Sequence, residues 1–135
     1  MFAFSVLAYN HSALNGTWTL VPAKSDFAGQ TVVQTGTVTI TDQTGVVVIS
    51  RSFKYEGAND TFFYSDSTGS ENNSTVHLGK DFKSKTRWDH RVLKVTTTQS
   101  GAVTVENYSL APDGDMTVSV VRPEHKPFTL VFQRQ

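Results

Sequence analysis

The chain of 135 residues contains no cysteine, which excludes a disulfide framework, a thiolate metal site and a cysteine nucleophile. Its 12 basic and 12 acidic residues cancel, whereas domains that bind nucleic acid through phosphates are usually clearly basic. The histidines at positions 11, 77, 90 and 125 lack metal-ligand spacing. No apolar run approaches the roughly 20 residues that span a bilayer. We therefore expect no metal, no cofactor, no nucleic-acid partner and no membrane-spanning segment.

Catalytic signatures are also missing. The sequence has no Ser-His-Asp order with an elbow glycine, no phosphate-binding glycine loop and no dinucleotide fingerprint. Asp113-Gly114 is typical of a turn and lacks the following acidic ligands of a calcium loop. These absences predict a protein that is not an enzyme.

What is present is the composition of a β-protein. Thr, Ser and Val are abundant, charged residues make up only 18%, and no helical periodicity exceeds two turns. Alternating segments recur between short turns, and the longest polar loop is expected at 65–73. About eight to ten such strands in series predict an antiparallel up-and-down β-barrel, because closure removes exposed sheet edges. A two-sheet β-sandwich is the alternative.

The predicted domain is a single barrel over residues 14–135, preceded by residues 1–13. The apolar run from Met1 to Tyr9 is either a first strand, a disordered tail or the remnant of a signal peptide. In the last case Val6-Leu7-Ala8 resembles the small-residue cleavage pattern. That interpretation implies export to the periplasm or the extracellular space, and we expect a monomer.

The segment 82–88 has two clearly different faces. Lys83, Lys85 and Arg87 alternate with the more apolar set Phe82, Ser84, Thr86 and Trp88. If the latter set points inward, its small hydroxyl side chains leave volume for a ligand beside Trp88. The alternative is an ordinary core strand that tolerates these small residues.

Aromatic and basic side chains supply the other candidate ligand-binding residues. Phe53, Tyr55, Tyr64 and Tyr108 are expected to line the interior, although tyrosine also suits a barrel rim. Arg51 and Arg122 share their faces with apolar neighbours, and an inward arginine would suggest an anionic ligand because a buried charge needs a partner. An error of one residue in the phase of the strand would instead point both outward.

The segment Gly16-Thr17-Trp18 resembles the Gly-x-Trp signature of lipocalins and their calycin relatives. With Ser25 and Phe27 downstream, it is also similar to the opening of fatty-acid-binding proteins. The chain further resembles small bacterial lipocalin-like proteins, which share Gly-Thr-Trp, a Lys-Ser-x-x-x-Trp-Asp stretch (here 83–89) and a final Phe-x-Arg/Lys-Gln (here 132–135). The likeness spans residues 14–135.

The resemblance implies that Trp18 plugs one end of the barrel under a stacked arginine, supplied by Arg134 or Arg122. Gly16 is expected to leave room there for another backbone. Two features of fatty-acid-binding proteins are absent: the gap after the first strand is too short for their two-helix lid, and Leu130-Val131-Phe132 replaces their Arg-x-Tyr carboxylate clamp.

Two functions remain open from the sequence. One is non-catalytic binding of a small, mostly hydrophobic ligand in the barrel lumen. The other is a structural or protein-interaction module of the cell envelope, with a filled interior.

Overall fold

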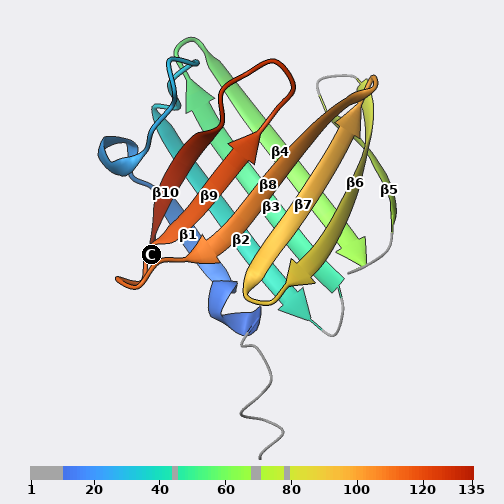
Figure 1. The fold of residues 1–135 in the computed structure, drawn as a ribbon, viewed down its shortest axis with the longest axis horizontal. Coiled ribbons are helices and arrows are strands. Elements are labelled where there is room, and N and C mark those ends of the chain that lie inside the picture. Colours follow the sequence, from blue (N-terminus) through green and yellow to red (C-terminus); the bar gives the residue numbers. More distant parts are fainter. Residues whose placement is uncertain (1–10, 44–45, 68–70, 78–79) are drawn as a thin grey trace, which may run out of the picture.

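The computed structural model describes residues 11–43, 46–67, 71–77 and 80–135, with side chains for 13–42, 46–60 and 82–135. Within these residues, ten antiparallel strands form one sheet in the order β4-β3-β2-β1-β10-β9-β8-β7-β6-β5 (Figure 1). The strands are β1 (Gly16–Leu20), β2 (Thr35–Gln43), β3 (Val46–Tyr55), β4 (Ala58–Ser67), β5 (Glu71–His77), β6 (Lys80–Asp89), β7 (Val92–Gln99), β8 (Ala102–Leu110), β9 (Met116–Val121) and β10 (Phe128–Arg134). The predicted all-β, up-and-down architecture is confirmed.

The sheet curls until its first and last strands meet. β1 pairs with β10, with Trp18 opposite Arg134 and Leu20 opposite Phe132. The strands β1–β4 thus lie behind β7–β10 in Figure 1. β4 and β5 are the two edges of the sheet, and the described residues form no ladder between them. The two edge strands nevertheless lie beside each other, so the sheet curls nearly all the way round.

The connection between β1 and β2 carries no α-helix, as its length predicted. It contains a single 3-10 turn, η2 (Pro22–Lys24), and a second such turn, η1 (His11–Leu14), precedes β1. The backbone of Asp26 exchanges hydrogen bonds of 2.8 and 2.9 Å with Thr129 of β10, which ties this connection to the barrel. No helix among the described residues is long and apolar enough to cross a membrane. The run Met1–Tyr9 lies outside the described residues.

The prediction of a long polar loop at 65–73 is wrong. β4 continues to Ser67 because it pairs along the whole of β3, from Tyr55 opposite Ala58 to Val46 opposite Ser67. β5 begins at Glu71 and pairs with β6. A ladder satisfies backbone donors and acceptors whatever the side chains are, so a polar segment can belong to a strand.

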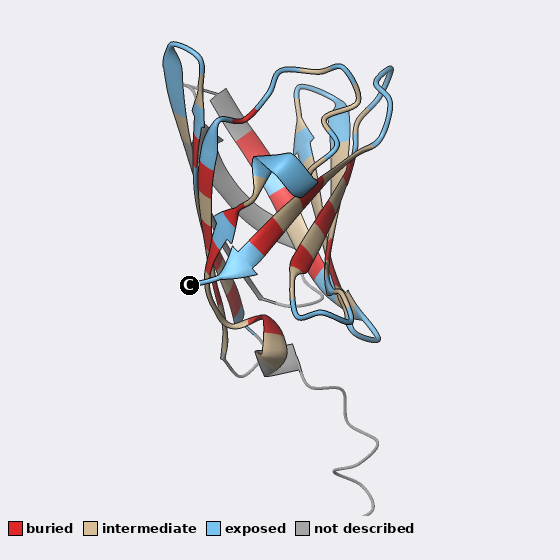
Figure 2. Cartoon of the chain, turned by 90° about the vertical axis from the view of Figure 1, so that its left-hand side faces the viewer, coloured by how far each residue is buried: buried red, intermediate tan, exposed pale blue. Residues whose placement is uncertain are grey.

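The hydrophobic core lies on the inner face of the sheet. Figure 2 shows buried residues alternating with exposed ones along the strands, and Trp18, Tyr108 and Phe132 are the largest fully buried side chains. Phe82, Ser84 and Thr86 are buried in β6 while Lys83 and Arg87 are exposed, so the predicted phase of this strand is confirmed. Full burial of one large apolar side chain contributes about 1.5–3 kcal/mol.

Trp18 seals the end of the barrel that we call the closed end. Its indole Nε1 donates to the carbonyl of Leu14 at 2.9 Å. The guanidinium of Arg134, not Arg122, lies over the indole, with Cζ 4.2 Å from the ring centroid. The Arg134 nitrogens donate to the carbonyls of Asn15 and Ala13 at 2.7 and 2.6 Å.

Gly16 makes room for this guanidinium. A Cβ atom at Gly16 would lie 2.7 Å from Arg134 Nη1. The residue also has φ +136, a backbone conformation that disfavours every residue type except glycine. The group that approaches Gly16 is therefore the Arg134 side chain. The prediction that another backbone segment approaches Gly16 is wrong.

We expect Arg134→Ala to lower the free energy of unfolding by about 1–3 kcal/mol, because it removes a cation–π contact and two hydrogen bonds. Urea denaturation measures the change. Gln133→Ala, on the neighbouring exposed residue, is the control and should change stability little. Equal effects of the two substitutions would contradict the role given to Arg134.

Candidate functional site

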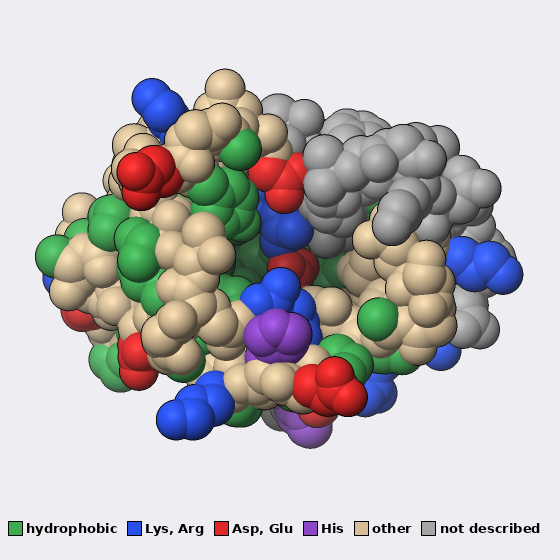
Figure 3. Space-filling model, turned by 90° about the horizontal axis from the view of Figure 1, so that it is seen from above, with side chains coloured by type: hydrophobic (Ala, Val, Ile, Leu, Met, Phe, Trp, Pro, Cys, Tyr) green, Lys and Arg blue, Asp and Glu red, His purple; other side chains and the backbone are tan. Residues whose placement is uncertain are grey.

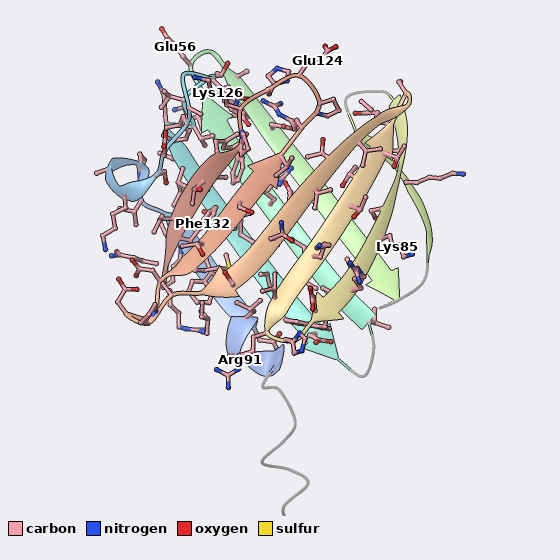
Figure 4. All side chains as sticks on the ribbon, viewed as in Figure 1. Glu56, Lys85, Arg91, Glu124, Lys126 and Phe132 are labelled. Carbon is pink, nitrogen blue, oxygen red and sulfur yellow. The ribbon has the colours of Figure 1, made fainter. Side chains whose placement is uncertain are left out.

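A cavity of about 270 Å³ lies inside the barrel at the end opposite Trp18, which we call the mouth. The turns β3–β4, β7–β8 and β9–β10 surround the mouth, and Glu56, Glu124 and Lys126 lie on them in Figure 4, whereas Phe132 lies deeper. Seen from above in Figure 3, the molecule is hollowed here, with basic and acidic side chains inside. The lining residues are Arg51, Phe53, Tyr55, Asp60, Thr97, Gln99, Ala102, Thr104, Glu106, Val120, Arg122, Phe128 and Leu130.

Strand alternation brings these side chains together. Arg51, Phe53 and Tyr55 are every second residue of β3 and point to the inner face. Thr104 and Glu106 do the same in β8, on the opposite wall. Both arginines predicted to share an apolar face, Arg51 and Arg122, line the cavity, so the phase predicted for them is confirmed.

Arg51 and Glu106 form a buried ion pair at the floor of the cavity. Nη1 of Arg51 donates to Oε2 of Glu106, and the two side chains are 14% and 5% exposed. The hydroxyl of Tyr108 donates to the other carboxylate oxygen at 3.1 Å. The Arg51 guanidinium also lies 5.0 Å from the ring centroid of Phe53. These contacts compensate two charges that burial alone would strongly disfavour.

Arg122 occupies a different environment near the mouth. One terminal nitrogen donates to the amide oxygen of Gln30, and the guanidinium lies 5.5 Å from the ring centroid of Phe128. The amide nitrogen of Gln30 donates in turn to the carbonyl of Lys126 at 2.8 Å. Gln30 thus fastens the β1–β2 connection to the β9–β10 turn. Nε of Arg122 is buried and has no hydrogen-bond partner.

A second, more open hollow adjoins the cavity. It has a volume of about 610 Å³, and we call it the vestibule. Tyr55, Arg122 and Phe128 line both spaces, so these three side chains stand where the vestibule meets the cavity. A small molecule that moved from the vestibule into the cavity would pass these three side chains.

Burial raises the pKa of Tyr55 above its usual value of 10.0. Desolvation of the phenolate is the largest cause, and the positive charge of Arg51 opposes it. Tyr55 therefore remains a neutral hydrogen-bonding group at the mouth over the physiological pH range.

The structure separates the predicted ligand-binding residues into groups. Phe53, Tyr55 and Arg122 line the cavity. Tyr108 lies below it, bonded to Glu106. The side chain of Tyr64 lies outside the described residues.

The three candidates on β6 do not line the cavity. Ser84 and Thr86 are buried on the inner face, and the hydroxyl of Thr86 has no hydrogen-bond partner. Trp88 is beside the turn to β7, and its Nε1 donates to Asp42 Oδ2 at 3.1 Å. Since β6 runs toward the closed end, its residues descend away from the mouth.

Several residues that shape the site were missed by the sequence analysis. Glu106 was detectable as a charge that alternates with Thr104 and Tyr108 on a buried face. The role of Gly36 is harder to predict from sequence. A Cβ atom at this position would lie 2.8 Å from Phe53 Cδ1, so only glycine leaves room for the phenyl ring. Gln30 carries no sequence signal, because its role depends on contact with a turn more than 90 residues away.

No group of three potential metal ligands occurs among the described residues.

The chain matches no family model and no curated protein sequence. It is similar in structure to the REP1-NXSQ fatty acid transporter, with 20% identity, a TM-score of 0.71 and coverage of 92% of this chain and 97% of that one. A Schistosoma mansoni fatty acid binding protein in complex with arachidonic acid shares 17% identity, with a TM-score of 0.66 and coverage of 93% and 98%. Secretory abundant heat soluble protein 4 from Ramazzottius varieornatus shares 13% identity, with a TM-score of 0.69 and coverage of 92% and 96%. These similarities confirm the expected calycin-like fold, shared with fatty-acid-binding proteins.

We expect Glu106→Gln to lower the free energy of unfolding by about 3 kcal/mol, because it leaves the buried charge of Arg51 without its carboxylate. Chemical denaturation measures the loss. Glu56→Gln, at an exposed turn position, is the matched control. Replacing both partners, with Arg51→Met and Glu106→Leu, should cost much less than Glu106→Gln alone. A change below 0.5 kcal/mol in Glu106→Gln, on the order of an exposed substitution, would show that the pair contributes little.

Tyr55 should ionise at higher pH than an exposed tyrosine in a spectrophotometric titration, with Tyr55→Phe identifying its component. In the unfolded chain the phenol loses its proton first, so the unfolded state binds fewer protons as the pH rises above 10.0. The stability associated with Tyr55 is thus present below pH 10.0 and decreases above it. Identical alkaline loss of stability in wild type and Tyr55→Phe would contradict this assignment.

Proposed function

We propose that the protein binds a small, mostly hydrophobic molecule in the mouth half of the barrel and does not transform it chemically. The observation that carries this proposal is the cavity of about 270 Å³ that the side chains leave unfilled. Phe53, Phe128 and Leu130 give it apolar walls on which a ligand can bury its surface.

Polar groups are placed to orient the ligand rather than to react with it. Arg122 and Tyr55 stand at the entrance, and Thr97 and Gln99 lie on the wall formed by β7. A catalytic nucleophile would need an adjacent base within hydrogen-bond reach. The carboxylate of Glu106, at the floor of the cavity, instead accepts hydrogen bonds from Arg51 and Tyr108.

The similar structures support the same class of function. Two of them are a fatty acid transporter and a fatty acid binding protein in complex with arachidonic acid. Both are named for binding or transport of a hydrophobic molecule, and both span nearly the whole of this chain.

The structural or interaction module is the second candidate, favoured by the packing of the closed half. Trp18, Tyr108 and Phe132 are 0–1% exposed and pack in that half. If the cavity near the mouth held no ligand, the outer surface would be the functional part.

Titration with the fluorescent probe 8-anilinonaphthalene-1-sulfonate tests the proposal. The wild type should bind the probe, and a lipid extract should displace it. Thr104→Phe adds a ring inside the cavity and should weaken binding at least about tenfold, because the ring takes the ligand's volume. Val103→Phe adds the same ring to the adjacent, outward residue of β8 and should leave binding unchanged.

Native mass spectrometry decides between the two candidates. A protein that binds neither the probe nor any component of a lipid extract would support the filled module. Equal weakening by Thr104→Phe and Val103→Phe would show that the probe binds outside the cavity.

A further inference from the structure

We propose that the ligand is a compact carboxylic acid, in which one acid group is attached to an apolar body of about one or two rings, and that Arg122, Thr97 and Thr104 hold the acid group. This inference rests on the proposed function and names the ligand class for the same cavity. It follows from the arrangement of one wall, the hydrogen bonds left unmade there, the distribution of charge and the volume.

The three residues form a row across neighbouring strands. Thr97 of β7 lies directly opposite Thr104 of β8. Val121 of β9 lies opposite Val105, so the next residue, Arg122, continues the row beside Thr104. Side chains at such opposed positions have Cβ atoms about 4.5–5.5 Å apart. All three line the cavity, so its wall carries two hydroxyls and a guanidinium in line.

Two polar atoms in this row are buried without a partner. They are Oγ1 of Thr97 and Nε of Arg122. Buried polar groups are nearly always hydrogen-bonded, and each exception needs an explanation. A hydroxyl and a guanidinium N–H can both donate. Neither atom is exposed to the cavity, so an acceptor oxygen there would bond them once the Thr97 hydroxyl and the Arg122 side chain turn toward it.

The charge next to Arg122 favours an anionic group at that point of the cavity. Arg51 is neutralised by Glu106 at the floor. Asp60 adds a negative charge to the lining on the β3–β4 wall, where it lies opposite Phe53 in the ladder. The contacts of Arg122 are the neutral amide of Gln30 and the ring of Phe128, and no carboxylate of the described residues lies within ion-pair distance of it. A planar carboxylate, with two oxygens, suits a guanidinium beside a hydroxyl.

The volume restricts the rest of the ligand. The cavity, at about 270 Å³, is slightly smaller than the range of about 300–1,000 Å³ for drug-sized ligands. Below its floor, Tyr108 and Phe132 are almost completely buried, so a long chain cannot descend. A long chain would have to extend into the vestibule, which is open to solvent and offers its methylene groups little burial.

Isothermal titration calorimetry with four compounds tests the inference: 3-phenylpropanoate, its neutral amide, decanoate and hexadecanoate. The wild type should bind 3-phenylpropanoate at least about tenfold more tightly than the amide, because only the acid pairs with Arg122. It should also bind 3-phenylpropanoate more tightly than hexadecanoate.

Arg122→Gln should weaken binding of the acid by about 10- to 100-fold and change binding of the amide much less. Thr97→Val should weaken binding of the acid by about 3- to 10-fold. Two matched controls should leave both affinities unchanged: Arg87→Gln on the exposed face of β6, and Thr98→Val on the exposed residue next to Thr97. Circular dichroism and urea denaturation confirm that each variant is folded.

The outcomes separate this inference from the proposed function. Tighter binding of hexadecanoate, with no effect of Arg122→Gln, would overturn the ligand class and leave hydrophobic binding intact. Failure of all four compounds and of the fluorescent probe would overturn the proposed function itself. If Arg122→Gln does not fold, the preference of the wild type for acid over amide and the effect of Thr97→Val decide the question, and absence of both overturns the inference.

Discussion

The ion pair between Arg51 and Glu106 divides the interior of this barrel into two halves. It joins β3 to β8, on opposite walls, at the floor of the cavity. On one side of it Tyr108 and Phe132 pack without exposure. On the other side the walls hold a cavity. Removing either charge would leave the other buried and uncompensated, so the pair holds β3 and β8 together at the floor of the cavity.

The two ends of the barrel use arginine and loop carbonyls in contrasting ways. At the closed end, Arg134 covers Trp18, and each of its two terminal nitrogens donates to a carbonyl. At the mouth, Arg122 contacts one amide oxygen and one aromatic ring, and its Nε makes no hydrogen bond. The same residue type therefore closes one end and leaves hydrogen-bonding capacity inside the other.

Much of the fold was predictable because strand alternation has an exact physical consequence. A period of two assigns every second residue to the inside, so the inward placement of Phe82, Ser84 and Thr86 followed from sequence. The extent of the candidate site did not follow, because alternation says which face a residue takes and nothing of its height in the barrel. Trp88 shares the inner face of β6 but belongs to the closed end, where it bonds to Asp42. Its height depends on register and strand tilt, which are properties of the whole sheet.

Arg51 and Arg122 show most clearly what a sequence leaves open. Both are single basic residues on an apolar face, and the same argument from desolvation applies to each. What distinguishes them is the neighbour that each meets: β8 brings Glu106 across the barrel to Arg51, whereas it places Thr104 beside Arg122, at the end of the adjacent strand β9. That difference arises from the register and stagger of the strands. It makes one arginine a structural tie and leaves the other as a positive charge facing an unfilled volume.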